Sequence, residues 1–351
     1  MTRGTTSAVR SLTGDDVEAA AEVVAASHAR LVAQAPHLPR RAAEDYRGKL
    51  AWLVEHGIVL GRWRDGRLAA VLGGFRIEDF RHAGPGVFSP DWANAAADPA
   101  TAFDDYRVLY RAIAPRWLEA GARLHALAVL ACAKEAIEAL SLTGFGRIVM
   151  DAAAPTSAVA ARTGAATDRL TTDGLTTDGV STDGVTTDGV TTDGVTTDGV
   201  TTRRATADDA EAIAAMEARL AEHIGASPVF FPNPRGADAG WWRAWLAEPT
   251  SVAVLAETAA GPVGYVKAED PQDDVSDVVH DPSCLAINGM YCDPTVRGRG
   301  VGTALVAALA EHAAATCKPL MSVDCETHNL EAYGFWTRFF TPVTWGYERR
   351  V

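Results

Sequence analysis

The fold of this chain is decided by the stretch Val296-Arg297-Gly298-Arg299-Gly300-Val301-Gly302. It follows a predicted strand, Cys284–Cys292, and it opens an apolar run at residues 304–310 that predicts a helix. Glycine lets the backbone approach a ligand closely, and the first amides of a helix lack internal partners at the positive end of the dipole. We therefore interpret the stretch as a phosphate-binding junction between strand and helix, with a tight glycine turn as the simpler alternative.

Composition and charge limit the classes of protein to which the chain can belong. A length of 351 residues suggests two domains, and an apolar content of 48% is enough for real cores. The net charge of −13 argues against nonspecific nucleic-acid binding. No apolar run approaches the roughly 18 residues of a membrane span, and residues 1–16 lack an apolar leader. We expect a cytoplasmic protein without membrane or nucleic-acid partners, and its five scattered cysteines predict reduced thiols.

A short repeat divides the chain. Residues 171–200 are six pentads of the type TTDGV. A period of five matches neither strand nor helix, and one apolar residue in five cannot build a core. We interpret residues 166–202 as a flexible acidic linker between domains at residues 1–165 and 203–351, with a regular solenoid as the alternative.

The sequences on either side of the repeat resemble each other. Thr13-Gly14-Asp15-Asp16 and Thr206-Ala207-Asp208-Asp209 each follow a short predicted strand and precede an amphipathic run. This pattern predicts a Thr N-cap with acids in the first helical turn. Each half then shows a hairpin signal, at residues 64–67 and 260–262, and ends with a strand, a helix and a strand. One mixed α/β fold copied twice explains this order, and we expect the two halves to pack together.

The second half, about residues 203–351, resembles the Gcn5-related N-acetyltransferase (GNAT) superfamily. The family's pyrophosphate signature, Arg/Gln-x-x-Gly-x-Gly/Ala, reads Arg297 to Gly302 here, after a strand and Pro294. The resemblance implies two GNAT-like domains, each a twisted mixed β-sheet flanked by helices, and acetyl-CoA as co-substrate without a metal. It implies coenzyme contacts along the loop and along the strand that faces the pantetheine arm: Met290, Tyr291, Cys292, Arg297, Gly298, Arg299, Gly300, Val301, Gly302, Thr303 and Asn329.

A second family motif begins at Asn329 and carries two departures. The matching positions are Asn329, Ala332 and Phe335. The family's Tyr, which protonates the leaving thiolate, is Trp336 here, and a motif glycine is Phe340. An indole N–H donates hydrogen bonds but is no practical acid. Tyr333, three residues before Trp336 on the same helical face, is a candidate acid or a packing residue.

The general base is not evident from the sequence. Asp324 and Glu326 alternate on a predicted strand and share a face that is directed either to the site or to solvent. Three further candidates near strand edges are Glu269, Asp270 and His280. A zinc site made of His280, Cys284 and Cys292 has no standard ligand spacing, and core cysteines are the simpler interpretation.

The acceptor region and the first half complete the expectations. Residues 230–234 with Trp241, Trp242 and Trp245 stand where the family binds its acceptor, so they either line a pocket or pack a helix. Residues 87–94 replace the glycine loop and lack its glycines and arginines, so we expect no coenzyme in the first half.

The chain is thus expected to transfer acetyl from acetyl-CoA to a small-molecule or protein amine in a ternary complex. A coenzyme-binding or protein-interaction module without turnover is the alternative.

Overall fold

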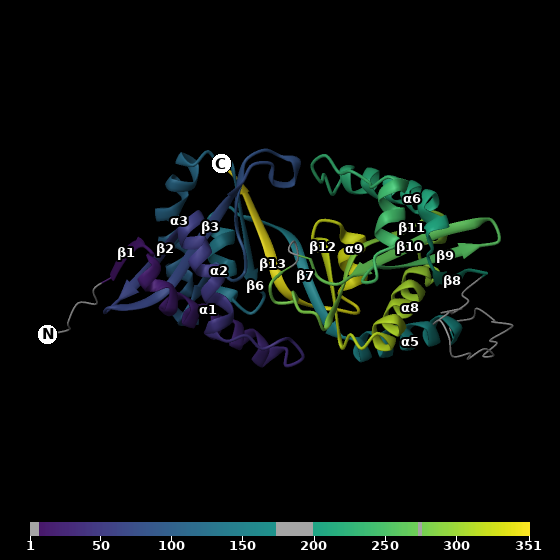
Figure 1. Cartoon of the computed structure of the whole chain (residues 1–351), viewed down its shortest axis with the longest axis horizontal. Helices are drawn as coiled ribbons and strands as arrows, with labels where there is room; N and C mark the ends of the chain where they lie inside the picture. Colours follow the sequence, from purple (N-terminus) through teal and green to yellow (C-terminus); the bar gives the residue numbers. More distant parts are fainter. Residues whose placement is uncertain (1–6, 173–198, 273–275) are drawn as a thin grey trace.

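The computed structural model describes residues 7–172, 199–272 and 276–351 (Figure 1). The elements of the first half are β1 (Ser7–Ser11), α1 (Val17–Gln34), α2 (Ala43–His56), β2 (Ile58–Arg64), β3 (Arg67–Ile77), β4 (Gly86–Ser89), β5 (Asn94–Ala96), α3 (Pro99–Glu119), β6 (Leu124–Leu130), α4 (Lys134–Leu142), β7 (Gly146–Pro155) and α5 (Thr156–Thr172). Those of the second are β8 (Thr201–Arg204), α6 (Ala210–Gly225), α7 (Ala239–Leu246), β9 (Val252–Thr258), β10 (Gly261–Glu269), β11 (Cys284–Cys292), α8 (Val301–Ala315), β12 (Leu320–Glu326), α9 (Leu330–Trp336) and β13 (Thr341–Arg350).

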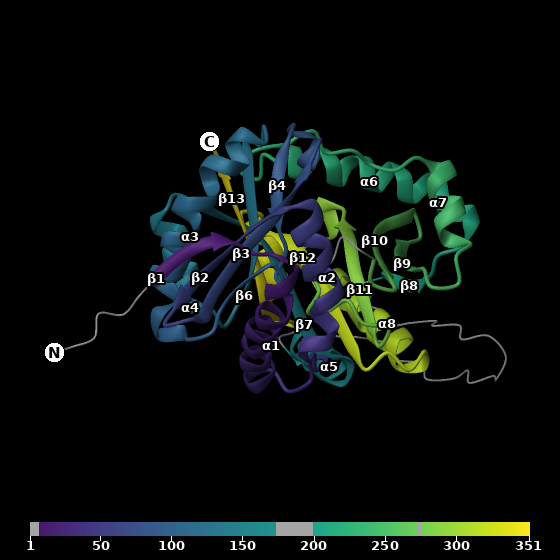
Figure 2. The same cartoon turned by 60° about the vertical axis from the view of Figure 1, so that its left-hand side comes forward.

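The described strands form one continuous mixed sheet, with β4–β6 and β11–β12 as its parallel pairs. The strand order is β1-β2-β3-β4-β6-β13-β7-β12-β11-β10-β9-β8, with β5 paired to β3. Read from either edge, the sheet presents corresponding strands of the two halves in the same order. The predicted mixed α/β fold of two similar halves is therefore confirmed (Figures 1 and 2).

The two halves exchange their last strands at the centre of the sheet. β7 lies between β12 and β13, pairing Met150 with Cys325 on one side and with Trp345 on the other. β13 in turn lies between β7 and β6, where Tyr347 pairs with Leu127. The halves are consequently joined by backbone hydrogen bonds as well as by side-chain packing.

The duplicated helix starts are built in the same way. Asp16 accepts a hydrogen bond from the Thr13 backbone at 2.9 Å and pairs with Arg10 at 2.6 Å. Asp209 accepts from the Thr206 backbone at 2.8 Å and pairs with Arg203 at 2.8 Å. Thr13 and Thr206 are the N-caps of short 3-10 turns, Gly14–Asp16 and Ala207–Asp209, whereas the N-caps of α1 and α6 themselves are Asp16 and Asp209. In each half this acid also fixes an arginine of the preceding strand.

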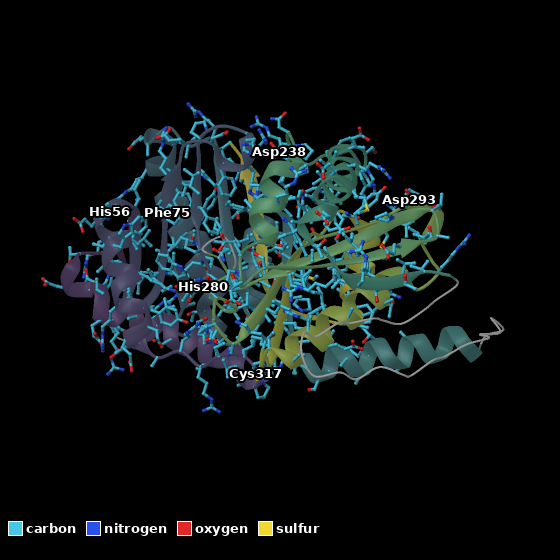
Figure 3. The ribbon with its side chains drawn as sticks, turned by 45° about the vertical axis from the view of Figure 1, so that its right-hand side comes forward. His56, Phe75, Asp238, His280, Asp293 and Cys317 are labelled. Atoms are coloured by element: carbon cyan, nitrogen blue, oxygen red, sulfur yellow. The ribbon has the colours of Figure 1, made fainter. Side chains whose placement is uncertain are left out.

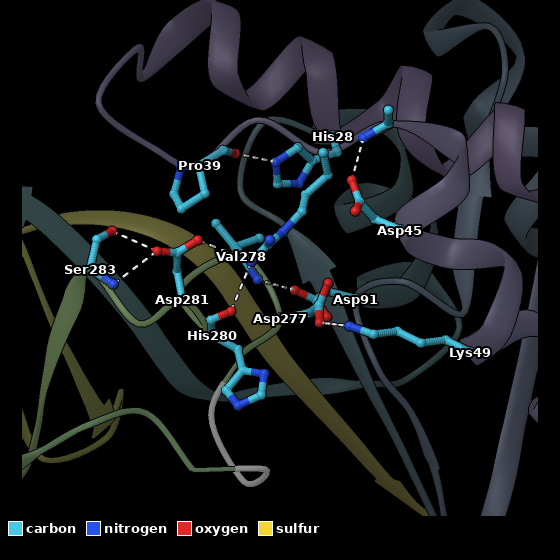
Figure 4. A network of polar contacts seen from close by, with 12 residues as sticks. His28, Pro39, Asp45, Lys49, Asp91, Asp277, Val278, His280, Asp281 and Ser283 are labelled. Atoms are coloured by element: carbon cyan, nitrogen blue, oxygen red, sulfur yellow. Dashed lines mark hydrogen bonds and ion pairs between the residues drawn. The ribbon is translucent and has the colours of Figure 1, made fainter. Parts of the chain in front are cut away.

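A loop of the second half, residues 276–283, packs against the first half (Figure 4). The buried Asp91 carboxylate accepts hydrogen bonds from Ser276 Oγ at 2.8 Å and from the Val278 amide at 3.2 Å. Lys49 pairs with Asp277, and Arg41 donates to the His280 carbonyl at 2.8 Å. These polar contacts surround an apolar core cluster that includes residues of α1 and of the 276–283 loop.

The boundaries of the expected linker, residues 166–202, differ from the structure at both ends. Helix α5 continues to Thr172, beyond residue 166, and β8 begins at Thr201. Residues 173–198 of the repeat lie outside the described residues. None of the helices in the described ranges combines the length and apolar character that crossing a membrane requires.

We expect Met150→Ala to destabilise both halves together. Met150 is fully buried on β7 between the two halves, and its truncation removes core packing worth about 2–5 kcal/mol. Urea unfolding followed by tryptophan fluorescence and far-UV circular dichroism should show one transition at lower denaturant. The control Leu142→Ala removes a side chain that is 68% exposed and should change stability by less than about 0.5 kcal/mol. Two separate transitions in the parent protein would contradict the exchange of strands.

Candidate functional site

The glycine loop joins β11 to α8 with two glycines in left-handed conformations. Gly298 has φ 76° and Gly300, the N-cap of α8, has φ 84°. A third glycine, Gly302, allows a close approach, since a Cβ there would lie 3.0 Å from the Phe335 ring. Only glycine adopts these conformations without strain, so the loop shape depends on these positions. Figure 3 labels Asp293 at the end of β11, where the carboxylate accepts from the Thr295 amide at 3.0 Å and begins the turn.

Strands β11 and β12 diverge beside this loop. Their parallel ladder ends at the pair Ile287 and Val323. Beyond it, Met290–Cys292 pair with β10, while Asp324–Glu326 pair with β7. A register shift at Lys267/Ala268 of β10 marks the point of divergence. One edge of β11 therefore leaves its neighbour where the resemblance implies a pantetheine arm.

A cavity of about 1020 Å³ lies at this divergence and reaches the glycine loop. All the predicted coenzyme contacts other than the exposed Arg299 line it: Met290, Tyr291, Cys292, Arg297, Gly298, Gly300, Val301, Gly302, Thr303 and Asn329. The buried Asn329 also caps α9, accepting a hydrogen bond from the Ala332 amide at 3.2 Å. The lining set does not include the three predicted catalytic residues, which lie on neighbouring elements: Asp324 and Glu326 on β12, and Tyr333 on α9.

The cavity is cationic in an acidic protein. Among the described residues that line it, three are arginines, Arg162, Arg297 and Arg338, and one is an acid, Glu331. Arg297 pairs with Glu331 at 2.8 Å and donates to the Cys292 carbonyl at 3.1 Å. Since the whole chain has a net charge of −13, this local excess of positive charge favours an anionic ligand.

Trp336 does not replace the family's acid, because it belongs to the core. Its side chain is 4% exposed and packs against Phe335 and Phe340, with ring centroids 4.9 and 5.9 Å away. Tyr333 is half-buried one helical turn earlier and contacts the same core.

The aromatic segment of α7 is mainly packing. Trp242 is fully buried, Trp245 is nearly so, and the Trp242 indole donates to Glu217 at 2.6 Å. The cation that these rings surround is the protein's own Lys267, whose Nζ lies 5.4 Å from the Trp242 centroid and 5.8 Å from that of Trp245. The interpretation as helix packing therefore holds for these two residues, whereas Trp241 is 43% exposed.

The remaining candidates at strand edges have structural partners. Glu269 accepts hydrogen bonds from the Trp245 indole at 3.0 Å and from the Asn288 side chain. Asp270 pairs with Lys318 at 2.6 Å, and His280 lies in the loop between the halves. Within the described part of the chain, no three His, Cys, Asp or Glu side chains are grouped to hold a metal ion.

Burial raises the pKa of the Cys292 thiol to about 11, so this residue is a neutral thiol at pH 7.

The first half has closed the corresponding gap with its own side chains. The β4–β6 ladder ends at Ser89 and Leu127, as the β11–β12 ladder does in the second half. Here, however, the buried Asn94 donates to the Ala128 carbonyl at 2.9 Å and accepts from the Tyr106 hydroxyl at 2.8 Å. Burial raises the pKa of Tyr106, which keeps its hydroxyl protonated as the donor. The space beside β4 is therefore occupied by Asn94 and Tyr106.

Arg162 is a lining residue that our reading of the sequence missed. It lies on α5, in the first half of the chain, and reaches the cavity because β7 is exchanged into the second half. No motif surrounds it, so the sequence contains no signal that would have identified it.

Comparisons with known proteins bear on the fold and on the family profile of the second half. Residues 217–340 match the profile of the acetyltransferase (GNAT) family. A GCN5-related N-acetyltransferase from Sphaerobacter thermophilus superposes with a TM-score of 0.56 at 12% identity, covering 98% of this chain and 95% of that one. The glucosamine N-acetyltransferase region of a fungal multi-domain β-N-acetylglucosaminidase gives 0.51 at 10% identity, covering 99% of this chain and 38% of that one. A tandem GNAT protein from the clavulanic acid biosynthesis pathway gives 0.47 at 12% identity, covering 98% of each chain. A search of curated proteins found no match.

We expect Tyr106→Phe to destabilise the protein without affecting the cavity of the second half. The change leaves the Asn94 carbonyl buried without its donor, which costs about 1–3 kcal/mol. Urea denaturation measures this loss. Titration of the folded variant with acetyl-CoA, the co-substrate that the sequence resemblance implies, should give the parent affinity within twofold. A variant as stable as the parent would show that the Asn94 network does not hold the gap closed.

Proposed function

We propose, from the membership of residues 217–340 in the acetyltransferase (GNAT) family, that the chain is an acetyl-CoA-dependent N-acetyltransferase. The observation that carries the proposal is the arginine-lined cavity, which joins a left-handed glycine loop to the divergence of β11 and β12. Its volume of about 1020 Å³ and its positive charge suit a ligand that joins a pyrophosphate to an extended, uncharged arm. The acceptor is an amine of a small molecule or of a protein.

The glycine loop would hold the pyrophosphate. The first amides of α8 are free of helical partners, and Arg297 adds a charge beside them. The bend at Gly298 and Gly300 brings these amides to the cavity without side chains between them and the ligand.

The free edge of β11 would hold the pantetheine arm and the thioester. In the reaction, the acceptor nitrogen attacks the thioester carbonyl, a C–N bond forms, and the C–S bond breaks to release the coenzyme thiolate. A backbone N–H of Met290–Cys292 would stabilise the carbonyl oxygen as negative charge develops on it. The proton of the attacking ammonium passes to a base, for which Asp324 and Glu326 are our candidates.

Protonation of the thiolate is the step at which this chain departs from its family. Because Trp336 is packed in the core, we assign the role of acid to Tyr333, one helical turn away on α9. The same departure favours the second candidate function, a protein that binds the coenzyme without turnover. Release of coenzyme A with a panel of amines separates the two, because binding without release supports only the second.

We expect Gly300→Asp to weaken acetyl-CoA binding by at least about a hundredfold, because it places bulk and negative charge beside the pyrophosphate. Calorimetric titration measures the affinity. The matched control is Gly66→Asp, which has φ 79° in the open β2–β3 turn and so carries the same backbone strain far from the cavity. Equal affinities of the two variants would remove the loop from the coenzyme site.

We expect Tyr333→Phe to lower kcat about a hundredfold while the affinity for acetyl-CoA stays unchanged, because general acid catalysis contributes about 10²–10⁴-fold. Steady-state rates of thiol release and calorimetric titration test the two parts. An unchanged kcat would exclude Tyr333 and leave water to protonate the thiolate.

A further inference from the structure

Helix α5 of the first half forms part of the wall of the cavity in the second. It follows β7 directly, so the exchange of strands places it along α8 (Figures 1 and 2). Arg162, Ala165 and Ala166 of α5 line the same cavity as the glycine loop. The two alanines leave room for a ligand, and Arg162 adds a positive charge.

Arg162 and Arg338 both line this cavity and both contact Phe339. The Arg162 Nη1 donates to the Phe339 carbonyl, which orients the guanidinium and uses one of its five donors. Arg338 stacks on the same aromatic pair, 4.8 Å from the Phe335 centroid and 5.4 Å from that of Phe339. Two arginines, one from each half, therefore contact Phe339, Arg162 at its backbone carbonyl and Arg338 at its ring.

This pair is separate from the arginine near the glycine loop. Arg297 contacts Glu331 in the first turn of α9, whereas Arg338 and Phe339 follow its last turn. The seven residues of α9 span on the order of 10 Å. The cavity thus has a cationic group at either end of α9, Arg297 at its start and Arg338 after its end.

We propose that Arg162, together with Arg338, binds the 3′-phosphate of the coenzyme's adenosine. This inference rests on the proposed function, because it takes the ligand to be coenzyme A. Coenzyme A carries a third phosphate on its ribose, apart from the pyrophosphate, and arginine forks bind phosphate oxygens in pairs. The first half, although its own gap is closed, then supplies a residue that distinguishes coenzyme A from 3′-dephospho-coenzyme A.

The experiment compares coenzyme A with 3′-dephospho-coenzyme A by calorimetric titration of the full chain. We expect the parent protein to bind coenzyme A at least about tenfold more tightly. Arg162→Gln should lower the affinity for coenzyme A about tenfold and change the affinity for 3′-dephospho-coenzyme A less than twofold. Arg338→Gln should act in the same direction, which guards against an indirect effect of one substitution.

The matched control is Arg107→Gln on α3, the corresponding helix to α8. Arg107 is also exposed and stacks on a phenylalanine, with its guanidinium 5.2 Å from the Phe103 centroid. It belongs to the first half and is not among the described residues that line the cavity. It should leave both affinities unchanged. If Arg162→Gln lowered the affinities for both ligands equally, or lowered neither, the proposal would be overturned while the proposed function stayed intact. A parent protein that binds neither ligand would overturn the proposed function and this inference with it.

Discussion

The position of β7 between β12 and β13 is the constraint on which the rest of the structure depends. Both edges of this strand pair with strands of the second half, and its central residues Met150, Ala152 and Ala153 are fully buried. Because β13 makes the reciprocal pairing with β6, neither half has a complete sheet without the other. The exchange also fixes α5 against α8, so that residues from both parts of the chain surround one cavity. A separable pair of domains would not produce this arrangement.

The two copies differ where the fourth strand of each leaves its parallel neighbour. In both, the ladder ends after four residue pairs and the following segment leads to a long helix. The second gap lies beside the glycine loop and begins at a register shift in β10, whereas Asn94 and Tyr106 fill the first. The shared helix caps at Asp16 and Asp209 show that the framework around the two gaps has stayed alike. A few side chains in one segment therefore distinguish the copy with an open gap from the copy whose gap is filled.

Local features of this protein are predictable from its sequence, and long-range pairings are not. The glycine loop, the Thr caps and the hairpins depend on residues next to each other, and the structure has all of them. The partners of β7 are not predictable in this way, because its apolar residues would pack equally well in either half. Arg162 was missed for the same reason, since only the exchange brings it to the cavity. The sequence could not decide whether the α7 tryptophans line a pocket or pack a helix. The cation beside them, Lys267, comes from a strand of the same chain, and that contact is visible only in the structure.

The exchange of strands also determines the stage of synthesis at which the sheet can be completed. The edge of β6 that β13 covers belongs to the first half, yet β13 (Thr341–Arg350) is synthesised after all the other described strands. Until then β6 and β7 have unpaired edges, and such edges tend to join strands of other chains. Contacts between residues about two hundred positions apart in the chain form slowly, because a long loop must close first. Protection of the incomplete sheet on the nascent chain is thus a requirement set by the topology itself.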